Sequence, residues 1–299
     1  MRRIPLLLFL TILHVSNAFF VTNTDHCTKE TALHSVVDDI VDSSRNVLND
    51  EEPGGQKSTI TNRAPHLIFP GGGLFFYWQA GAVTYMREQG YDLSKVTASG
   101  ASAGALTAAL MATDVDFYKA TDRALQLSER AGIWDRSGGL QGIWGDLIYE
   151  WLDDLLPENA VEMASDGKLS LLVTPIPSFG KTRVSSWKNR KELIKCCMTS
   201  VHLPWFLDGK LTANYCNQPH IDGSFLAKAP DYLPEHRRPS SILRLDWNRD
   251  PALAEGEFFD FVKVISPEGI WNILETGKVY AKLMDERGKF KRLPKIDGQ

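Results

Sequence analysis

Hydrophobic positions along the chain follow two kinds of pattern. Short uninterrupted apolar runs, bounded by turn-forming residues, predict buried strands. These runs cover residues 66–69, 96–100, 169–176 and 241–245. Longer stretches with apolar residues at helical spacing predict helices between and after the strands. These stretches cover residues 74–89, 103–112, 115–131, 140–156, 191–199 and 270–286.

One predicted helix raises a question about its apolar face. The stretch over residues 140–156 carries two tryptophans, Trp144 and Trp151, on a broad apolar stripe. Such a stripe is either a lipid-facing surface or part of the core, and the core is the more common case. We therefore expect this helix to pack inside the domain.

The first residues resemble a targeting segment. Met1-Arg2-Arg3 is followed by an apolar run over residues 4–15 and by the small residues of Ser16-Asn17-Ala18. This order is typical of a secretory signal peptide over residues 1–18, removed before Phe19. An uncleaved hydrophobic anchor is one alternative. A two-part plastid targeting sequence of an alga is another, although the acidic residues that follow are unusual for a transit peptide.

Residues 19–63 are expected to precede the main domain as a helix and a linker. Apolar residues recur at helical spacing from Ala32 to Leu48, and residues 49–65 are rich in turn formers without periodicity. The main domain then covers residues 64–299.

The composition of the chain mainly argues against certain classes of protein. The chain of 299 residues is 43% hydrophobic and 23% charged, with a net charge of −4. These values are ordinary for a globular domain and give no basic field for nucleic acid. The spacing of Cys27, Cys196, Cys197 and Cys216 matches no zinc or haem motif and is too sparse for a disulfide framework. We expect no metal.

A candidate nucleophile stands where the second predicted strand meets a helix. Gly100-Ala101-Ser102-Ala103-Gly104 has the G-x-S-x-G pattern between a strand and a helix. In that setting a sharp turn exposes the serine hydroxyl, and the flanking small residues leave room for a substrate. The alternative is a small-residue helix start packed closely on a sheet, because the pattern also occurs by chance.

A glycine triplet ends the first predicted strand. Pro70 and Gly71-Gly72-Gly73 separate that strand from an apolar helix. Uncovered backbone N–H groups at a helix start form a cradle for an anion or an oxyanion. A dinucleotide fingerprint would need glycine at position 76, where Phe76 stands. A purely structural glycine turn remains possible.

A third signal lies late in the chain. In Pro219-His220-Ile221-Asp222-Gly223-Ser224, an apolar residue precedes an Asp-Gly turn. This arrangement places a carboxylate at the end of a strand, although Asp-Gly turns are common in loops.

These three motifs, in this order, resemble the patatin-like phospholipase family. The segments 155–160, 184–194 and 199–204 between them are also similar to that family, so the resemblance covers about residues 66–247. It implies an α/β fold with three layers, in which helices cover both faces of a mainly parallel sheet. It further implies catalysis by a serine–aspartate dyad, without a cofactor.

The resemblance also assigns roles to single residues. It implies that Ser102 is the nucleophile, with Gly100 and Gly104 completing the elbow, and that Asp222 is the base within the motif Asp222-Gly223-Ser224. The implied oxyanion donors are the backbone N–H groups of Gly71, Gly72, Gly73 and Ala103. An ordinary aspartate with a pKa of about 3.9 is a weak base toward serine. We therefore expect burial to raise the pKa of Asp222.

Two departures from the family pattern stand out. Gly73 is followed by Leu74-Phe75-Phe76, where many members carry a basic residue. This apolar version is similar to the animal triacylglycerol lipase branch and puts a preference for phospholipids in doubt. Ser224 stands where glycine or alanine is commoner, a change that we expect to be harmless.

The function expected from the sequence is hydrolysis of lipid acyl esters at a membrane or lipid-droplet surface, with triacylglycerol, phospholipid and galactolipid as open substrates. One alternative is an α/β-hydrolase whose triad is Ser102, Asp222 and His236. His236 lies in a polar loop, and His202 and His220 are expected to be packing or turn residues. A second alternative is a non-catalytic lipid-binding member of the family.

Overall fold

The computed structural model describes residues 64–233, 239–253 and 264–296. These residues belong to the larger of two compact units, Thr59–Gln299. The expected signal peptide, the helix over residues 32–48, residues 49–63 of the linker and His236 lie outside the described residues.

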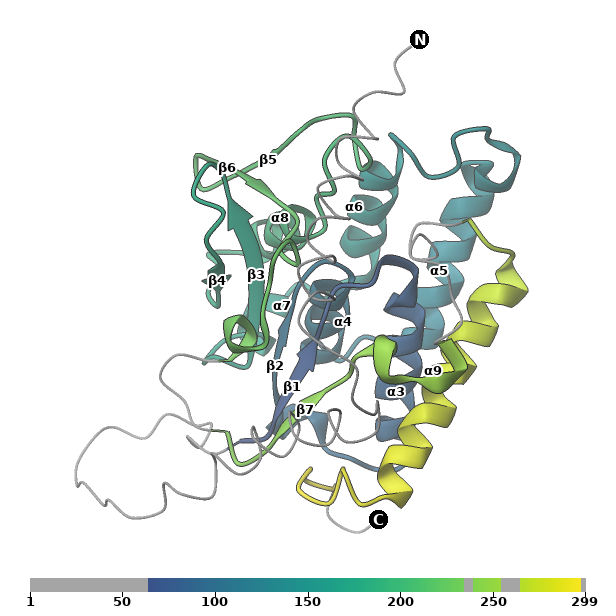
Figure 1. Ribbon diagram of the computed structural model, residues 1–299, viewed down its shortest axis with the longest axis vertical. Coiled ribbons are helices and arrows are strands. Elements are labelled where there is room, and N and C mark those ends of the chain that lie inside the picture. Colours follow the sequence, from purple (N-terminus) through teal and green to yellow (C-terminus); the bar gives the residue numbers. More distant parts are fainter. Residues whose placement is uncertain (1–63, 234–238, 254–263, 297–299) are drawn as a thin grey trace, which may run out of the picture. The chain divides into compact units, whose positions relative to one another are not determined.

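The described strands form one mixed sheet with a parallel centre (Figure 1). Its members are β1 (His66–Phe69), β2 (Thr97–Gly100), β3 (Leu169–Pro175), β4 (Thr182–Val184), β5 (Ala213–Tyr215), β6 (Gln218–Ile221) and β7 (Ile242–Arg244). The strand order is β5-β6-β3-β2-β1-β7, and β4 also pairs with β3. Parallel pairs join β7, β1, β2 and β3, whereas β4, β5 and β6 pair in antiparallel fashion.

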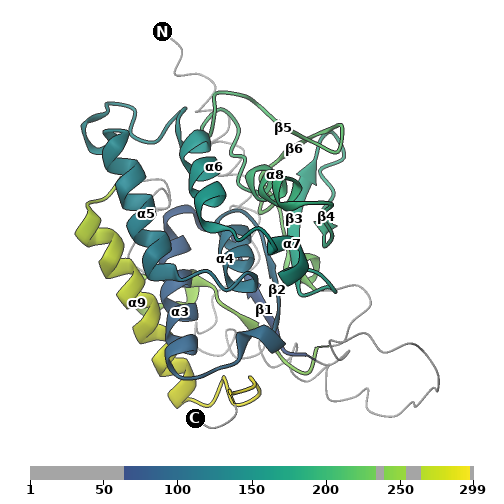
Figure 2. The ribbon, with the colours of Figure 1, turned by 180° about the vertical axis from the view of Figure 1, so that it is seen from behind.

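Helices flank this sheet. They are α3 (Phe76–Glu88), α4 (Ala103–Ala112), α5 (Phe117–Arg130), α6 (Trp144–Leu155), α7 (Ala160–Met163), α8 (Arg190–Ser200) and α9 (Pro267–Glu286). From behind, α4 lies across β1 and β2, with α5 and α6 farther out (Figure 2). The expected α/β fold with a mostly parallel sheet flanked by helices is confirmed. Among the described helices, none is long and apolar enough to span a membrane.

The two faces of the sheet pack against different clusters. The large hydrophobic core includes alternate residues of β1 and β3, such as Leu67, Phe69 and Leu171, together with α4 and α8. On the opposite face, Ile68 and Leu172 pack in a small cluster around Tyr232, which comes from the 3-10 helix Ala229–Tyr232. The alternation follows from strand geometry, in which successive side chains point to opposite faces.

Helix starts are set by local sequence. Asp116 precedes α5 and accepts a hydrogen bond from the Lys119 amide at 3.0 Å, while Asn189 does the same for the Glu192 amide at the start of α8. Ser266 caps α9 and is followed by proline in the first turn. A capping side chain satisfies an amide that has no partner within the helix, which fixes where the helix begins.

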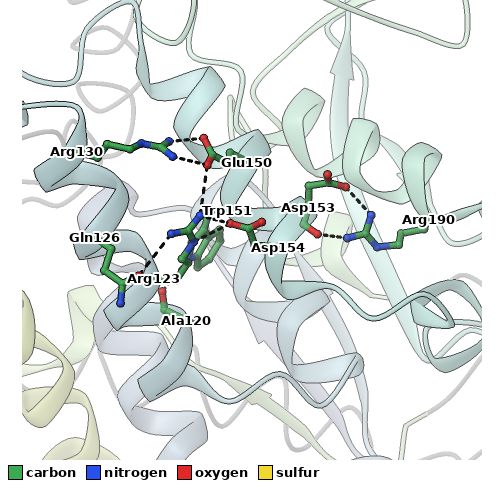
Figure 3. Close-up of polar contacts among 9 residues, drawn as sticks. All are labelled: Ala120, Arg123, Gln126, Arg130, Glu150, Trp151, Asp153, Asp154 and Arg190. Carbon is green, nitrogen blue, oxygen red and sulfur yellow. Dashed lines mark hydrogen bonds and ion pairs between the residues drawn. The ribbon is translucent and has the colours of Figure 1, made fainter.

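Helix α6 packs inside the domain, as the sequence analysis favoured. Trp151 is 6% exposed, and its indole N–H donates to the Ala120 carbonyl of α5 at 2.7 Å. On the outer side, Arg123 and Arg130 of α5 contact acidic residues of α6, including Glu150 (Figure 3). Exposed ion pairs of this kind contribute about 0–1 kcal/mol each, so the buried stripe dominates the contact. The helix begins at Trp144, later than the apolar pattern indicated.

The closest contact between helices joins α3 to α9. A Cβ atom on Gly81 would lie 1.9 Å from the Leu274 carbonyl oxygen, and one on Gly277 would lie 1.9 Å from the Trp78 carbonyl oxygen. The two backbones therefore touch directly, which only glycine permits. Ile270, Leu274 and Tyr280 of α9 are buried as expected, whereas Leu283 is 43% exposed and lies off the predicted apolar face.

Replacing Gly277 with alanine tests this backbone contact. Alanine gains about 0.5–1 kcal/mol in helix propensity, but overpacking against α3 costs about 1–3 kcal/mol. We expect Gly277→Ala to lower the free energy of unfolding in urea denaturation by at least about 1 kcal/mol. Gly138→Ala is the matched control, because a Cβ atom there would meet nothing within 4 Å. Unchanged or higher stability in Gly277→Ala would contradict the contact.

Candidate active site

Ser102 occupies a strained turn between β2 and α4. Its backbone has φ 54° and ψ −131°, a conformation that residues with a side chain rarely adopt. Such strain costs on the order of 1–3 kcal/mol and is retained only where the surroundings fix it. The Ser102 amide donates to the Ser200 hydroxyl at 3.0 Å, which ties the turn to the end of α8.

The two glycines of the elbow allow close backbone packing. A Cβ atom on Gly104 would lie 2.0 Å from the Phe69 carbonyl oxygen at the end of β1, and one on Gly100 would lie 2.1 Å from the Gly104 carbonyl oxygen. Larger residues at either position would push α4 away from the sheet. The small residues that flank Ser102 in the sequence are therefore required by packing.

Strand register brings Asp222 to the level of Ser102. β2 ends with Gly100 opposite Leu171, so Ser102 lies about level with Val173 of β3. β6 runs antiparallel to β3 with Ile221 opposite Thr174, so Asp222 also lies about level with Val173. Residues separated along the chain thus meet because one strand approaches β3 from the opposite direction.

The Asp222 backbone is fixed on both sides. Its amide donates to the His202 carbonyl at 2.9 Å, and its own carbonyl accepts from the Thr174 hydroxyl at 2.9 Å. The next residue, Gly223, passes so close to β3 that a Cβ atom would lie 1.9 Å from the Leu172 carbonyl oxygen. Glycine at position 223 is therefore required by close packing against β3 as well as by the turn.

The two carboxylate oxygens of Asp222 have different surroundings. Oδ1 accepts from the Ser224 amide at 2.8 Å and from the Ser224 hydroxyl at 2.6 Å. Oδ2 is buried and accepts no well-formed hydrogen bond from the described residues. The Ser102 hydroxyl nevertheless lies near enough to act on the carboxyl as a donor that lowers its pKa. Oδ1 is thus held in place by Ser224, whereas Oδ2 has no well-formed partner among the described residues.

Burial dominates the electrostatics of this carboxyl. Desolvation raises the pKa of Asp222 above its ordinary value, and the donors Ser102 and Ser224 and the charge of Lys181 oppose that rise. The upward direction agrees with the expectation for a base that accepts a serine proton. The Lys181 ammonium donates to the Thr174 hydroxyl at 2.9 Å and to the Phe225 carbonyl.

The glycine loop, Gly71–Gly73, lies against the other two motifs. A Cβ atom on Gly71 would lie 2.7 Å from Ser224 Cβ and 3.1 Å from Ser102 Cβ. The amides of Gly71, Gly72, Gly73 and Ala103 have no hydrogen-bond acceptor within the part of the chain that the structure describes. Four free donors near one serine are the arrangement expected of an oxyanion hole.

Two residues that support the glycine loop were missed by the sequence analysis. Gln79 of α3 is fully buried, donates to the Pro70 carbonyl at 2.8 Å and accepts from the Thr107 hydroxyl of α4 at 2.9 Å. Trp247, which follows β7, donates from its indole to the Gly71 carbonyl at 3.2 Å. A polar residue within the apolar first half of α3 was the available signal for Gln79, since buried polar groups need partners.

The imidazoles of His202 and His220 are engaged away from Ser102 and the Asp222 carboxylate. His220 hydrogen-bonds to the Gln218 carbonyl at 2.8 Å, and its ring packs edge-on against Tyr215. His202 is buried, with no hydrogen-bond partner for Nε2 among the described residues. Burial lowers the pKa of both. Neither imidazole makes a recorded hydrogen bond to Ser102 or Asp222, and both occupy packing or turn positions as expected.

The described part of the chain holds no group of three or more His, Cys, Asp or Glu side chains placed to bind a metal. Cys196 and Cys197 are buried free thiols, and Cys216 is an exposed free thiol. The groups gathered around Ser102 are its hydroxyl, the Asp222 carboxylate and the backbone amides of the glycine loop.

Parts of this chain are similar to known proteins. Two curated relatives, both named omega-hydroxyceramide transacylase, are 27% identical in Mus musculus and 25% identical in Homo sapiens over 172 residues. Each match covers 56% of this chain, but only 28% of the mouse protein and 32% of the human protein. The chain thus spans about a third or less of the length of these relatives.

A solved structure, that of VipD from Legionella pneumophila, covers 68% of this chain and 55% of its own, at 15% identity and a TM-score of 0.37. A structural similarity at that TM-score supports no conclusion about this chain. The sequence profile described as patatin-like phospholipase matches residues 67–230, a span that includes the glycine loop, the Ser102 elbow and the Asp222 turn. Because the match covers more than half of the chain, this protein belongs to the patatin-like phospholipase family.

Proposed function

We propose that this protein is a serine acyl hydrolase that cleaves carboxylic esters of lipids through a Ser102–Asp222 dyad. The observation that carries the proposal is the arrangement of the Asp222 carboxylate. Ser224 donates to Oδ1, Oδ2 is buried without a well-formed bond, and the Ser102 hydroxyl lowers the pKa of the carboxyl. A buried carboxylate with one uncommitted oxygen beside a strained serine is suited to accept the serine proton.

The first half of the proposed reaction forms an acyl-serine. Ser102 Oγ attacks the ester carbonyl carbon as its proton passes to Asp222. The negative charge on the former carbonyl oxygen is then stabilised by free amides of the glycine loop and Ala103, each worth about 3–4 kcal/mol in comparable sites. The tetrahedral intermediate collapses, the bond to the alcohol breaks, and the alcohol leaves with the proton from Asp222.

The second half releases the acyl group. A water molecule gives its proton to Asp222 and attacks the acyl carbonyl at the same oxyanion site. When this intermediate collapses, Ser102 Oγ takes the proton back and the fatty acid leaves. The carboxylate is thus base and acid in turn, and no third residue is needed to balance the protons.

Apolar side chains beside the acid turn support a lipid substrate. Leu226 is 53% exposed and Phe179 is 47% exposed, and the Phe179 ring packs near that of Phe225 with centroids 6.1 Å apart. Phe225 and Leu226 follow the Asp222-Gly223-Ser224 motif directly. Contiguous exposed apolar patches mark surfaces that contact lipids or partners, and these side chains would contribute to such a patch beside the acid turn. Glycerolipids (triacylglycerol, phospholipid or galactolipid) at a membrane or lipid-droplet surface are the proposed substrates.

The names of the two relatives favour a second candidate, acyl transfer to a lipid hydroxyl. Transfer passes through the same acyl-serine, with the hydroxyl of an acceptor such as an omega-hydroxyceramide in place of water. Incubating the protein with triacylglycerol, with and without that acceptor, and analysing products by mass spectrometry separates the two. Free fatty acid in both reactions supports hydrolysis, whereas acylated ceramide as the main product supports transfer.

The dyad itself is tested by removing each member. Ser102→Ala is expected to abolish turnover of a p-nitrophenyl ester, and Asp222→Asn to lower kcat/KM by at least about 10²-fold. Because the two act as a unit, the double variant should lose no more than Ser102→Ala alone. Ser128→Ala on α5 and Asp154→Asn on α6 are controls that should keep wild-type rates. Wild-type turnover in either dyad variant would disprove the assignment.

The pH dependence tests the bonds from Ser224. The base acts as a carboxylate, so kcat/KM falls as the pH drops through the pKa of Asp222. Ser224→Ala removes a hydroxyl donor that stabilises the charged form, so it raises that pKa and moves the acidic limb to higher pH. The value of kcat/KM on the alkaline plateau should change less than its value on the acidic limb. Ser178→Ala is the control, because its hydroxyl donates to Pro175 and should leave the limb in place. A limb that stays or moves to lower pH in Ser224→Ala contradicts this account.

Histidine substitutions distinguish the dyad from a triad. A general base contributes about 10²–10⁴-fold, so a variant lacking it should be severely impaired. We expect His202→Ala, His220→Ala and His236→Ala each to keep at least about a tenth of wild-type kcat/KM, with His236→Ala almost unchanged. A thousandfold loss in a well-folded His236→Ala protein would restore the α/β-hydrolase alternative.

A further inference from the structure

Trp247 contacts the glycine loop and Phe75, which follows it. Its indole N–H donates to the Gly71 carbonyl at 3.2 Å. Its ring stacks on Phe75, with centroids 4.0 Å apart and planes inclined by 18°. Phe75 is joined to the same loop, because its amide donates to the Gly72 carbonyl at 3.0 Å. The indole therefore spans the turn that separates β1 from α3.

The hydrogen bond to Gly71 fixes the direction of the next amide. The peptide between Gly71 and Gly72 is trans, since Ile176–Pro177 is the only cis bond among the described residues. In a planar trans peptide the C=O and the following N–H point in opposite directions. The carbonyl of Gly71 points at the indole, so the N–H of Gly72 points away from it.

The side of the loop away from Trp247 is the side of the nucleophile. A Cβ atom on Gly72 would lie 2.4 Å from Trp247 Nε1, so Trp247 covers that side of the loop. A Cβ atom on Gly71 would instead meet Ser224 and Ser102. The loop thus lies between the indole and the dyad. An N–H that points away from the indole is directed toward the reacting centre.

The neighbouring peptide is held by a different side chain. Gln79 Nε2 donates to the Pro70 carbonyl at 2.8 Å, which orients the Gly71 amide by the same geometry. Among the residues that the structure describes, only the Trp247 indole donates to the Gly71 carbonyl, so the orientation of the Gly72 amide depends on Trp247. Without that bond, glycine at both positions would let the peptide plane rotate at little cost.

We propose that Trp247 is a positioning residue for the oxyanion hole, and that its indole N–H holds the Gly72 amide toward the substrate oxyanion. The inference rests on the proposed acyl-serine function and concerns the same site. Removing an oxyanion donor outright costs about 10²–10³-fold in kcat. Losing the orientation of one donor should cost less, because the amide remains present and still samples the productive direction.

The experiment compares two replacements of Trp247. Trp247→Phe keeps an aromatic ring to stack on Phe75 but removes the N–H. Incorporating benzothienylalanine at position 247 keeps the shape of the indole and removes only the donor, which guards against a folding defect. Trp271→Phe is the matched control, since this half-buried tryptophan of α9 lies near Tyr118 and away from the glycine loop. The rate of p-nitrophenyl ester turnover is divided by the concentration of active sites. That concentration is measured by labelling Ser102 to completion with an organophosphonate.

We expect both 247 variants to lose at least about fivefold in kcat with KM changed by less than about twofold, because the amide acts on the transition state rather than on the bound ester. Trp271→Phe should match the wild type, and melting temperatures should remain similar. A loss below fivefold in the benzothienylalanine protein overturns the inference while leaving the dyad intact. An inactive wild type that the phosphonate does not label would instead disprove the proposed function, and the inference with it.

Discussion

The site depends on a direct backbone contact between the first turn of α4 and the end of β1. A Cβ atom on Gly104 would lie 2.0 Å from the Phe69 carbonyl oxygen, so α4 can begin there only because that position is glycine. This early start confines the turn between β2 and α4 and holds Ser102 at a φ of 54°. The same contact places Ser102 beside the glycine loop, which follows Pro70 after the end of β1.

A second constraint is the burial of a carboxylate without a full set of partners. Burying a charged group is costly unless hydrogen bonds or charges compensate it. Asp222 is compensated on Oδ1 by Ser224 and at longer range by Lys181, and burial still raises its pKa. In the proposed reaction, this residual cost makes the carboxylate a stronger base toward the Ser102 proton. Ser224, which the sequence analysis treated as a harmless replacement, donates two hydrogen bonds to this group.

Elements fixed by local interactions could be predicted from the sequence, whereas contacts between residues far apart in the sequence could not. β1, the β2–turn–α4 unit and the helix bounds of α4, α8 and α9 were readable because apolar runs, glycines and caps act locally. The short strands β4 and β5 carry little apolar signal and form only because β3 and β6 lie beside them. Trp247 contacts Gly71 across 176 positions of sequence, a pairing that no local pattern encodes. Asp222 was identified only through the family resemblance, because its Asp-Gly turn is common.

The central claim is that Ser102 carries the acyl group during turnover. Mixing the protein with a lipid ester, quenching in acid within the first turnovers and locating the added mass by peptide mass spectrometry tests it directly. The account predicts an acyl adduct on Ser102, within the peptide that joins β2 to α4. It also predicts that acid-quenched Ser102→Ala protein carries no adduct. Turnover accompanied by an acyl group on any other residue, or by no adduct under conditions that trap acyl-serines, would contradict it.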